Sequence, residues 1–570
     1  MKLRHFLGSS LLLSVLLAAA CTPAGSTGGP ANQAGPSEPA KPKRITVSVM
    51  DEPTSLSRAL NAPSVRGIDV VEELTNAAAA IRGRQGGLQP QLATELPTIA
   101  NGGWKTFPDG RMETTWALRE GARWHDGAPL SAEDFVFTAA VAQDRELAVF
   151  AQAAYENVED VQAPDARTVL VRWKRPYIDA DSLFTSRGSM PLPRHLLERA
   201  YQGDKAGFLQ LPYWTNDYVG SGPFRVKEWV QGTRMTLEAS ELYVLGRPKL
   251  DSIEVRFISD PNALAANVLA GTIDLTLGRG LDLEQAILIR DQWRDGRMDV
   301  APTNWLSLWP QLLTPNPPIV GDARFRRALL TGLDRQELVD RLMGGFSSVA
   351  HSYINPEDAE YPAIGSSVVR YDYDPARAAQ MMDALGYRKG ADGMLRDGAG
   401  QRIEMELRTT DGDLLRQKVL LSASDFWQRM GIAAEPYIVP RQRAQDQEYR
   451  ATFPAFELVR QPNSQSSLAS LHSRAARLPD NNFVGVGGTN YARYMNPEFD
   501  AQIDRFFVTI PKDERLQVLG QVVHHISDQL NVLGLFYAAN PTMIASKLVG
   551  VTTRNQDSTE AWNAQLWDVQ

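Results

Sequence analysis

The stretch GSGPFRVKEW, from Gly220 to Trp229, sets two glycines and a proline within four residues and continues at once as an alternating segment. Gly220 and Gly222 tolerate backbone angles that are closed to other residues, while Pro223 fixes its own φ and removes a backbone donor. The continuation, Phe224–Ser240, alternates on both sides of Gln231-Gly232, which predicts a hairpin. The stretch therefore predicts a sharp turn of the chain into a new pair of strands.

Outward from this turn, short strands and helices are mixed along the chain. Alternating hydrophobicity predicts strands, and apolar residues at helical spacing predict helices. The predicted strands are Ile45–Met50, Leu170–Trp173 and Ile253–Phe257, and the predicted helices are Ala132–Gln143, Asn262–Gly271 and Asp513–Leu530. Ser131 with Asp134 predicts a cap at the start of the first helix, and Gly271 predicts a left-handed end for the second. The mixture favours an α/β or α+β body.

The composition bounds the size and the class of the protein. The chain has 570 residues, of which 43% are hydrophobic, so large cores and several domains are expected. The net charge of −8 and the pI of about 5.6 argue against a nucleic-acid-binding protein, which usually carries a basic face.

The N-terminal segment has the layout of an export signal. Lys2 and Arg4 precede an apolar block from Leu11 to Leu17, and small residues lead to Cys21. Residues 1–20 are therefore predicted to be a signal peptide, since the apolar block is shorter than a transmembrane helix requires. Cys21 is the one cysteine of the chain and cannot form a disulfide within it. Residues 21–44 are rich in Gly, Pro, Ser and Ala, which predicts a flexible tether.

LAAAC, from Leu17 to Cys21, resembles the lipobox of bacterial lipoproteins, in which the signal is cut before a cysteine that is then acylated. Ala18 stands where that pattern prefers leucine, and ordinary secretion with an incidental cysteine is the alternative. By this resemblance, lipidation of Cys21 anchors the protein to the outer face of the bacterial cytoplasmic membrane or in the periplasm, because several acyl chains bind a membrane stably.

Six segments of the chain after Arg44, taken in order, resemble the extracytoplasmic solute-binding proteins of peptide and nickel ABC importers. The first contains the family's W-H-D-G element, and the second is the G-S-G-P-F turn quoted above. The segments are Thr114–Thr138, Gly220–Trp229, Tyr243–Leu275, Asp322–Asp340, Asp374–Thr409 and Tyr494–Asp504. The resemblance places the protein in solute-binding protein family 5, with the oligopeptide- and dipeptide-binding proteins.

The resemblance implies an α/β, bilobal periplasmic-binding-protein-like fold (type II, cluster C) with an extra inserted domain. Lobe I is then expected to comprise residues 45–80, 195–304 and 531–570. The extra domain II is expected at residues 81–194, and lobe III at residues 305–530. The chain would cross twice between the lobes, and a solute would bind in the cleft between them.

Aromatic residues mark both predicted crossings. Trp305 and Trp309 share one face whether the first crossing is a helix or a strand, and could either stack on a solute or fill the core. Tyr537 stands at the second crossing, where family members place an aromatic side chain near the ligand. A core role for the tyrosine is the alternative.

Residues Phe456–Ser467 match the family segment that contains the aspartate that clamps the ammonium of a bound peptide. This chain keeps an early acid, Glu457, but has no acid between Val459 and Ser467. A buried ammonium without a counter-charge is costly, so binding of a free peptide N-terminus is put in doubt. The polar candidates for solute contact are Arg460, Gln461, Asn463 and Gln465, with a solvated loop as the alternative.

Other candidate residues are weaker. Asn61 and Ser64 fall in SLSRALNAPS, where some family members contact ligand and where Ser57 and Arg58 replace the family's acid and proline. The chain lacks the H-E-x-x-H, G-x-S-x-G and S-x-x-K motifs, so no metal, cofactor or catalytic residue is predicted. Nickel or haem transport stays open for His472, although a surface histidine is favoured.

These observations together predict a membrane-tethered receptor that captures an oligopeptide or similar solute and delivers it to an ABC permease and its ATPase, without being an enzyme. A carbohydrate or an anionic small molecule is the alternative solute. A monomer is expected. A secreted hydrolase is disfavoured by the absent motifs, and a solute sensor or chaperone of the same fold remains as a function of another class.

Overall fold

The computed structural model describes residues 41–570, apart from 62–64, 85, 279, 444–445, 486–488 and 553–557. The predicted signal peptide, Cys21 and nearly all of the predicted tether therefore lie outside the described residues. Contacts divide the chain into Met1–Lys41 and a compact unit, Pro42–Gln570. In the described part of the chain, no helix has both the length and the apolar character needed to cross a membrane.

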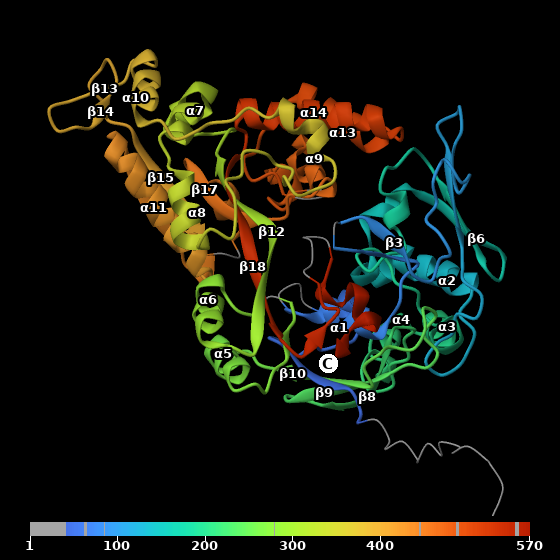
Figure 1. The fold of residues 1–570 in the computed structure, drawn as a ribbon. Coiled ribbons are helices and arrows are strands. Elements are labelled where there is room, and N and C mark those ends of the chain that lie inside the picture. Colours follow the sequence, from blue (N-terminus) through green and yellow to red (C-terminus); the bar gives the residue numbers. More distant parts are fainter. Residues whose placement is uncertain are drawn as a thin grey trace, which may run out of the picture. The chain divides into compact units, whose positions relative to one another are not determined.

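A mixed ten-stranded sheet runs through the Pro42–Gln570 unit (Figure 1). At its centre, β12 (Gly296–Pro310) and β18 (Leu533–Ala545) pair antiparallel along almost their whole lengths. Strands β11 (Leu275–Thr276), β1 (Arg44–Val49), β10 (Ser252–Phe257), β9 (Arg234–Ala239) and β8 (Phe224–Val230) follow in this order on the β18 side. Strands β17 (Phe456–Gln461), β15 (Glu404–Thr410) and β16 (Ala433–Val439) follow on the β12 side.

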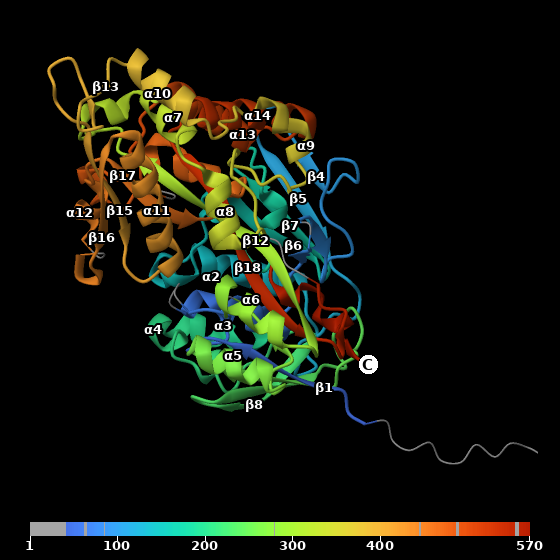
Figure 2. The ribbon, with the colours of Figure 1, turned by 60° about the vertical axis from the view of Figure 1, so that its left-hand side comes forward.

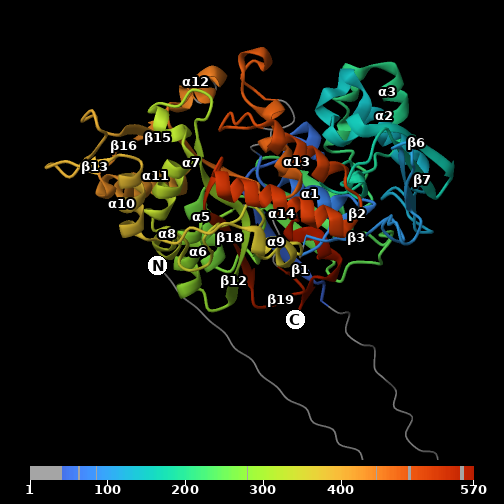
Figure 3. The same cartoon turned by 90° about the horizontal axis from the view of Figure 1, so that it is seen from above.

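The central strands of the sheet are buried because helices cover it. All residues of β18 are buried, which explains its nearly continuous apolar sequence, LGLFYAANPTMIA. The α/β layers form from helices α1 (Ile68–Thr75), α5 (Pro261–Leu269), α6 (Leu283–Gln292), α7 (Ala323–Thr331), α8 (Arg335–Met343), α9 (Tyr361–Ile364), α10 (Pro375–Ala384), α11 (Leu414–Met430), α12 (Gln447–Ala451), α13 (Pro497–Val508) and α14 (Lys512–Gln529). α11 packs against β15, β16 and β17 (Figure 2), while α8 contacts β18 and α7 contacts α10. α13 and α14 lie side by side in Figure 3.

Residues between α1 and β8 form a second sheet of their own. Strands β4 (Trp104–Thr106), β5 (Met112–Ala117), β7 (Thr168–Trp173) and β6 (Val158–Asp165) pair in this order, and α2 (Ala132–Gln143) packs against β6 and β7. Alternate residues of β5 and β7 are buried, as expected for strands with one face on a core. The segment is completed by β2 (Ala80–Arg82), β3 (Leu88–Pro90), α3 (Arg194–Gly203) and α4 (Lys205–Phe208). Short pairs β13 (Arg388–Lys389) with β14 (Leu395–Arg396) and β19 (Leu548–Val549) with β20 (Asp568–Val569) lie elsewhere.

The local predictions are confirmed within one residue at most helix and strand ends. β8 and β9 form the predicted hairpin, and Gly232 at its turn has a φ of 73°. Gly271 follows the end of α5 with a φ of 67°, as a left-handed end requires. At the start of α2, the backbone N–H of Ser131 donates to Asp134 Oδ2 at 2.8 Å, so the predicted cap is present.

Gly220 and Gly222 do not use the wider range of backbone angles that glycine tolerates. Neither residue lies in the left-handed region. Glycine is required for another reason, since a Cβ on Gly220 would lie 2.0 Å from the carbonyl oxygen of Thr75, and one on Gly222 would lie 2.5 Å from the backbone nitrogen of Asn76. The turn is therefore packed directly on the backbone at the end of α1, and any side chain would collide with it.

The division of Pro42–Gln570 into lobes and an inserted domain stays a prediction. Separate apolar cores do follow the chain. One core contains β1, β8–β10, α1 and the C-terminal residues to Trp567, and another contains α2 with β4–β7. Two further cores lie on opposite faces of β12, β17 and β18.

Candidate functional site

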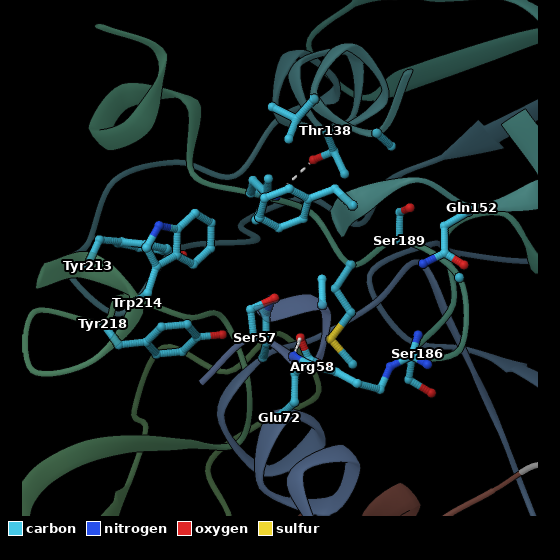
Figure 4. Close-up of a pocket in the computed structure, with 18 residues that line it drawn as sticks. Ser57, Arg58, Glu72, Thr138, Gln152, Ser186, Ser189, Tyr213, Trp214 and Tyr218 are labelled. Carbon is cyan, nitrogen blue, oxygen red and sulfur yellow. Dashed lines mark hydrogen bonds between the residues drawn. The ribbon is translucent and has the colours of Figure 1, made fainter. Parts of the chain in front are cut away.

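A partly enclosed cavity lies between the loop that precedes α1, α1 itself, α2 and the segments around residues 150, 188 and 214 (Figure 4). The volume of the cavity is about 50 Å³, which is room for a few waters or one small head group. Its polar lining is supplied by Ser57, Arg58, Glu72, Asn76, Thr138, Gln152, Ser186 and Ser189, and its aromatic lining by Phe150, Tyr213, Trp214 and Tyr218.

The acidic wall of this cavity is the Glu72 carboxyl of α1, and the adjacent Glu73 does not line the cavity. Glu72 and the adjacent Glu73 are 8% and 3% exposed, although they lie on a helix that is otherwise buried by apolar side chains. Glu72 Oε1 accepts the backbone N–H of Arg58 at 3.1 Å, and the hydroxyl of Thr559 donates to Glu73. Burial raises the pKa of each carboxyl to about 7, against the opposing effect of Arg58 on Glu72 and of hydrogen bonds from Ser186 and Thr559 on Glu73.

Two guanidinium groups lie at the edge of the acidic wall. Arg58 runs along the cavity toward Ser186 (Figure 4), and its Nη2 donates to the carbonyl oxygen of Arg187 at 3.0 Å. Arg187 Nη2 lies 3.7 Å from Asp69 Oδ2, in the first turn of α1. The loop before α1, α1 and the segment around residue 187 are thus joined by charged side chains.

The opposite wall is aromatic. The rings of Tyr213 and Trp214 meet edge to face at 4.9 Å, and Phe150 lies 5.5 Å from Trp214. The indole Nε1 of Trp214 donates to the carbonyl oxygen of Phe208 at 2.6 Å, which leaves the apolar part of the ring for the cavity. The hydroxyl of Tyr218 points into the cavity (Figure 4). The arrangement combines a buried carboxyl with ring faces, hydroxyls and an amide.

Most residues of this cavity were missed by sequence reasoning. Arg58 and Ser57 were noted only as departures from the family pattern, while the cavity's other residues come from segments far apart in the sequence. One local signal was present, because Glu72 and Glu73 interrupt the apolar sequence IDVVEELT of α1. Two adjacent acids in a short apolar helix are the signal that could have drawn attention to this position.

The aromatic residues predicted at the crossings lie together at the centre of the large sheet. Trp305 in β12 is opposite Tyr537 in β18 and opposite Gln461 in β17. Trp305 and Trp309 share one face of β12, as predicted, and both are buried. The Trp305 ring meets Tyr353 at 5.0 Å, Trp309 Nε1 donates to Ser307 Oγ at 3.0 Å, and the Tyr537 hydroxyl donates to the carbonyl oxygen of Ser352 at 2.8 Å. Their contact with a solute stays a prediction.

The polar residues predicted along β17 differ in their surroundings. Arg460 Nη2 donates to Asn540 Oδ1 at 2.9 Å and Nη1 lies 4.0 Å from Asp413 Oδ2. Asn463 is buried and donates to the carbonyl oxygen of Tyr353 at 2.8 Å, while Gln461 and Gln465 are half-buried. The early acid, Glu457, is buried against Arg450, with Arg450 Nη2 2.5 Å from Glu457 Oε1.

Asn61 lies in the loop before α1, away from β17. Its amide donates to the carbonyl oxygens of Ser55 and Ser57, both at 2.8 Å, and its Oδ1 accepts the N–H of Thr54 at 2.8 Å. The side chain therefore shapes the loop that presents Ser57 and Arg58 to the cavity. Ser64, the other residue predicted in this loop, lies outside the described residues.

The histidines do not gather into a metal site. Within the described ranges, no group of three or more His, Cys, Asp and Glu side chains is placed to hold a metal ion. His472 faces Asp500 and Asp504 at 3.5 and 3.4 Å. His524 and His525 point to different partners, the carbonyl oxygen of Ser367 and the hydroxyl of Tyr494.

Comparison with known proteins identifies the family. Residues 87–475 match the family described as bacterial extracellular solute-binding proteins, family 5 Middle. The chain is 25% identical to the oligopeptide-binding protein AppA of Bacillus subtilis over 468 residues, which cover 80% of this chain and 81% of AppA. It is 26% identical to Protein XP55 of Streptomyces lividans over 467 residues, which cover 81% of this chain and 77% of XP55.

Solved structures share the fold. The AppA structure from Bacillus subtilis in complex with a nonapeptide matches with a TM-score of 0.67 and 22% identity, covering 93% of this chain and 100% of AppA. NikZ from Campylobacter jejuni in complex with Ni(L-His) matches with a TM-score of 0.69 and 19% identity, covering 92% of this chain and 99% of NikZ. The predicted α/β periplasmic-binding-protein-like fold is thus confirmed. The chain belongs to the bacterial extracellular solute-binding proteins of family 5.

Proposed function

We propose that the protein is the substrate-binding lipoprotein of an ABC importer, which captures an oligopeptide or similar solute and delivers it to the permease. The proposal is carried by the match of residues 87–475 to the bacterial extracellular solute-binding proteins of family 5. It is supported by the similarity over most of the chain to an oligopeptide-binding protein. The protein binds its solute without altering it.

The proposed mechanism depends on the two long strands β12 and β18, which join the two halves of the large sheet. β12 pairs with β17 on one side and β18 pairs with β11 on the other, so the β12–β18 pair is suited to act as the hinge between the expected lobes I and III. A solute held by both sides prefers the closed form and shifts the population toward it, which the permease then recognises. Acylated Cys21 and the tether of residues 21–44 keep the protein, as a monomer, beside the transporter.

An anionic solute, or a carbohydrate, is the second candidate, and Arg460 favours the anion. Its guanidinium is largely buried at the end of β17, where the segment Val459–Ser467 contains no acid. A planar donor fork of this kind suits a carboxylate or a phosphate.

The proposed function is tested by identifying what the exported protein carries. The protein is purified from its own host under mild conditions, the co-purifying small molecules are identified by mass spectrometry, and each is titrated back by calorimetry. An unmodified peptide or small solute that binds reversibly, and whose uptake is lost when the gene is deleted, supports the proposal. Chemical conversion of the solute by the pure protein, or unchanged uptake after deletion, contradicts it.

A further inference from the structure

A second hollow, of about 400 Å³, lies between the residues that follow β12, the start of α7, the residues before α13 and the end of α14. This α7 hollow shares no lining residue with the cavity beside α1. In the described part of the chain, its charged lining is Arg326, Arg493 and Asp322, two cations and one anion. The α7 hollow is therefore a candidate site for an anion, separate from the candidate solute cavity.

Arg493 is the member of this lining that lacks a counter-charge. It is 6% exposed, and its Nε is buried without a hydrogen-bond partner. Among the described residues, no carboxylate lies within ion-pair distance of its guanidinium. Burial lowers the pKa of Arg493, and no nearby carboxylate opposes that effect. A buried cation without a counter-charge is costly, so an anion that enters the hollow beside Arg493 is favoured.

The other two charged groups do not remove this need. Arg326 is buried and held by backbone: its Nε, Nη1 and Nη2 donate to the carbonyl oxygens of Leu530, Val320 and Gln529 at 3.0, 2.7 and 2.7 Å. Two of its five N–H groups are left for another acceptor. Asp322 is already paired with Arg324, which does not line the hollow: Arg324 Nη2 lies 2.7 Å from Asp322 Oδ2, and its backbone N–H donates to Oδ1 at 2.8 Å. The one acid of the lining is thus engaged elsewhere.

The lining also indicates the kind of anion. The planar fork of a guanidinium matches two oxygens of a phosphate or a carboxylate. Leu313 and Met495 line the same hollow and are exposed, so they offer contact to an apolar part of the ligand. The volume of about 400 Å³ has room for a head group and several carbon atoms.

We propose that the α7 hollow binds a phosphate or carboxylate group that carries an apolar chain, with Arg493 as the group that donates to its oxygens and Arg326 as a second positive charge. The proposal does not depend on which solute the receptor carries. A free organic anion and the head group of an anionic lipid present the same chemistry, and the experiment distinguishes them.

The test uses four probes with the same six-carbon chain on the folded chain from residue 21, with Cys21→Ser to prevent acylation. Hexyl phosphate and hexanoate are titrated by calorimetry, with hexanol and hexylammonium as the neutral and cationic probes. We expect at least one of the anions to bind saturably, and hexanol and hexylammonium to bind at least about tenfold more weakly. Equal binding of all four probes, or tighter binding of hexylammonium, overturns the proposal.

Three variants assign the binding to the α7 hollow. Arg493→Gln should weaken anion binding by about 30-fold or more, as expected when one member of a buried charge pair is lost. Asp322→Asn removes the negative charge of the lining, keeps an acceptor for the Arg324 N–H, and should strengthen binding. The matched control Arg341→Gln, at a side chain that is 77% exposed, should leave it unchanged. If Arg460→Gln abolishes binding and Arg493→Gln does not, the anion occupies the end of β17 and the proposal is overturned.

Unfolding midpoints separate a binding role of Arg493 from a structural one. Without an anion, Arg493→Gln should be at least as stable as wild type, because a buried charge is removed. Hexyl phosphate should raise the midpoint of wild type and of Asp322→Asn but not that of Arg493→Gln. A lower midpoint for Arg493→Gln with an unchanged response to hexyl phosphate would make Arg493 a structural residue and overturn the proposal.

Sedimentation with lipid vesicles identifies the source of the anion. Binding to phosphatidylglycerol vesicles, but not to phosphatidylcholine vesicles, that is lost in Arg493→Gln supports the proposal with a lipid head group as the ligand. Arg493-dependent binding of the soluble anions without vesicle binding supports it with a free organic anion as the ligand. If neither the soluble anions nor the vesicles bind in a manner that depends on Arg493, the proposal is overturned, whatever the uptake experiment shows about the proposed function.

Discussion

At Gly220 a single hydrogen atom in place of a side chain decides whether a turn can form. We expect Gly220→Ala to destabilise the folded protein by about 3 kcal/mol or more, because its Cβ would lie 2.0 Å from the Thr75 carbonyl oxygen and one backbone would have to move. Urea unfolding followed by circular dichroism measures the effect. Gly87→Ala is the matched control, since a Cβ there meets nothing within 4 Å. Equal midpoints for the two variants would show that the turn is not tightly packed.

Glu72 makes stability depend on pH in a direction opposite to that of most carboxyls. Its pKa is raised by burial from 4.5 to about 7, so between these pH values the unfolded chain loses the proton first. The free energy of unfolding therefore falls as pH rises from 4.5 to 7, by up to about 3 kcal/mol for this group. Glu72→Gln should become more stable relative to wild type between pH 5 and pH 8. A difference that stays constant over this range would be incompatible with a buried Glu72 carboxyl.

At the scale of one element, α2 begins where its sequence predicts because Asp134 serves three partners. Its Oδ2 accepts the N–H of Ser131 at 2.8 Å and Trp124 Nε1 at 3.4 Å, and its Oδ1 accepts the N–H of Arg194 at 2.9 Å. We expect Asp134→Ala to cost about 2 kcal/mol, at the upper end for a lost cap, because buried donors are left without an acceptor. Glu133→Ala, in the same turn but exposed, should change stability by less than about 0.5 kcal/mol. Equal losses in urea unfolding would assign the effect to helix charge rather than to the cap.

Elements were predictable where the signal is local. The bounds of α2 follow from its cap and its apolar spacing, and the hairpin of β8 and β9 follows from alternation around Gly232. The pairing of β12 with β18 joins residues far apart in the sequence and has no local signal beyond two apolar runs. The candidate cavity could not be predicted from the sequence for the same reason. Glu72, Phe150 and Trp214 meet only after α1, α2 and the segment before β8 have packed together.

At the scale of the whole molecule, the polar and aromatic candidate residues fall into two separate regions. The Trp305–Tyr537 region is closed by internal hydrogen bonds and edge-to-face contacts, and it lies on the two central strands that join the halves of the sheet. The cavity beside α1 is partly enclosed and is lined by the buried carboxyl of Glu72 and the guanidinium of Arg58. We propose a division of labour, in which β12 and β18 transmit closure while the cavity beside α1 is a candidate site for the solute.

That division of labour predicts how a bound solute changes the unfolding of the molecule. A solute present at 100 times its Kd adds about 2.7 kcal/mol to the stability of the form that binds it. For a unit of about 530 residues this raises the unfolding midpoint by about 2 °C, and the shift grows with the logarithm of solute concentration. If scanning calorimetry resolves separate transitions for the two sides of the sheet, both should rise, because the closed form is held by contacts to both. A rise confined to one transition would mean that the solute binds one side alone and that β12 and β18 do not act as a hinge.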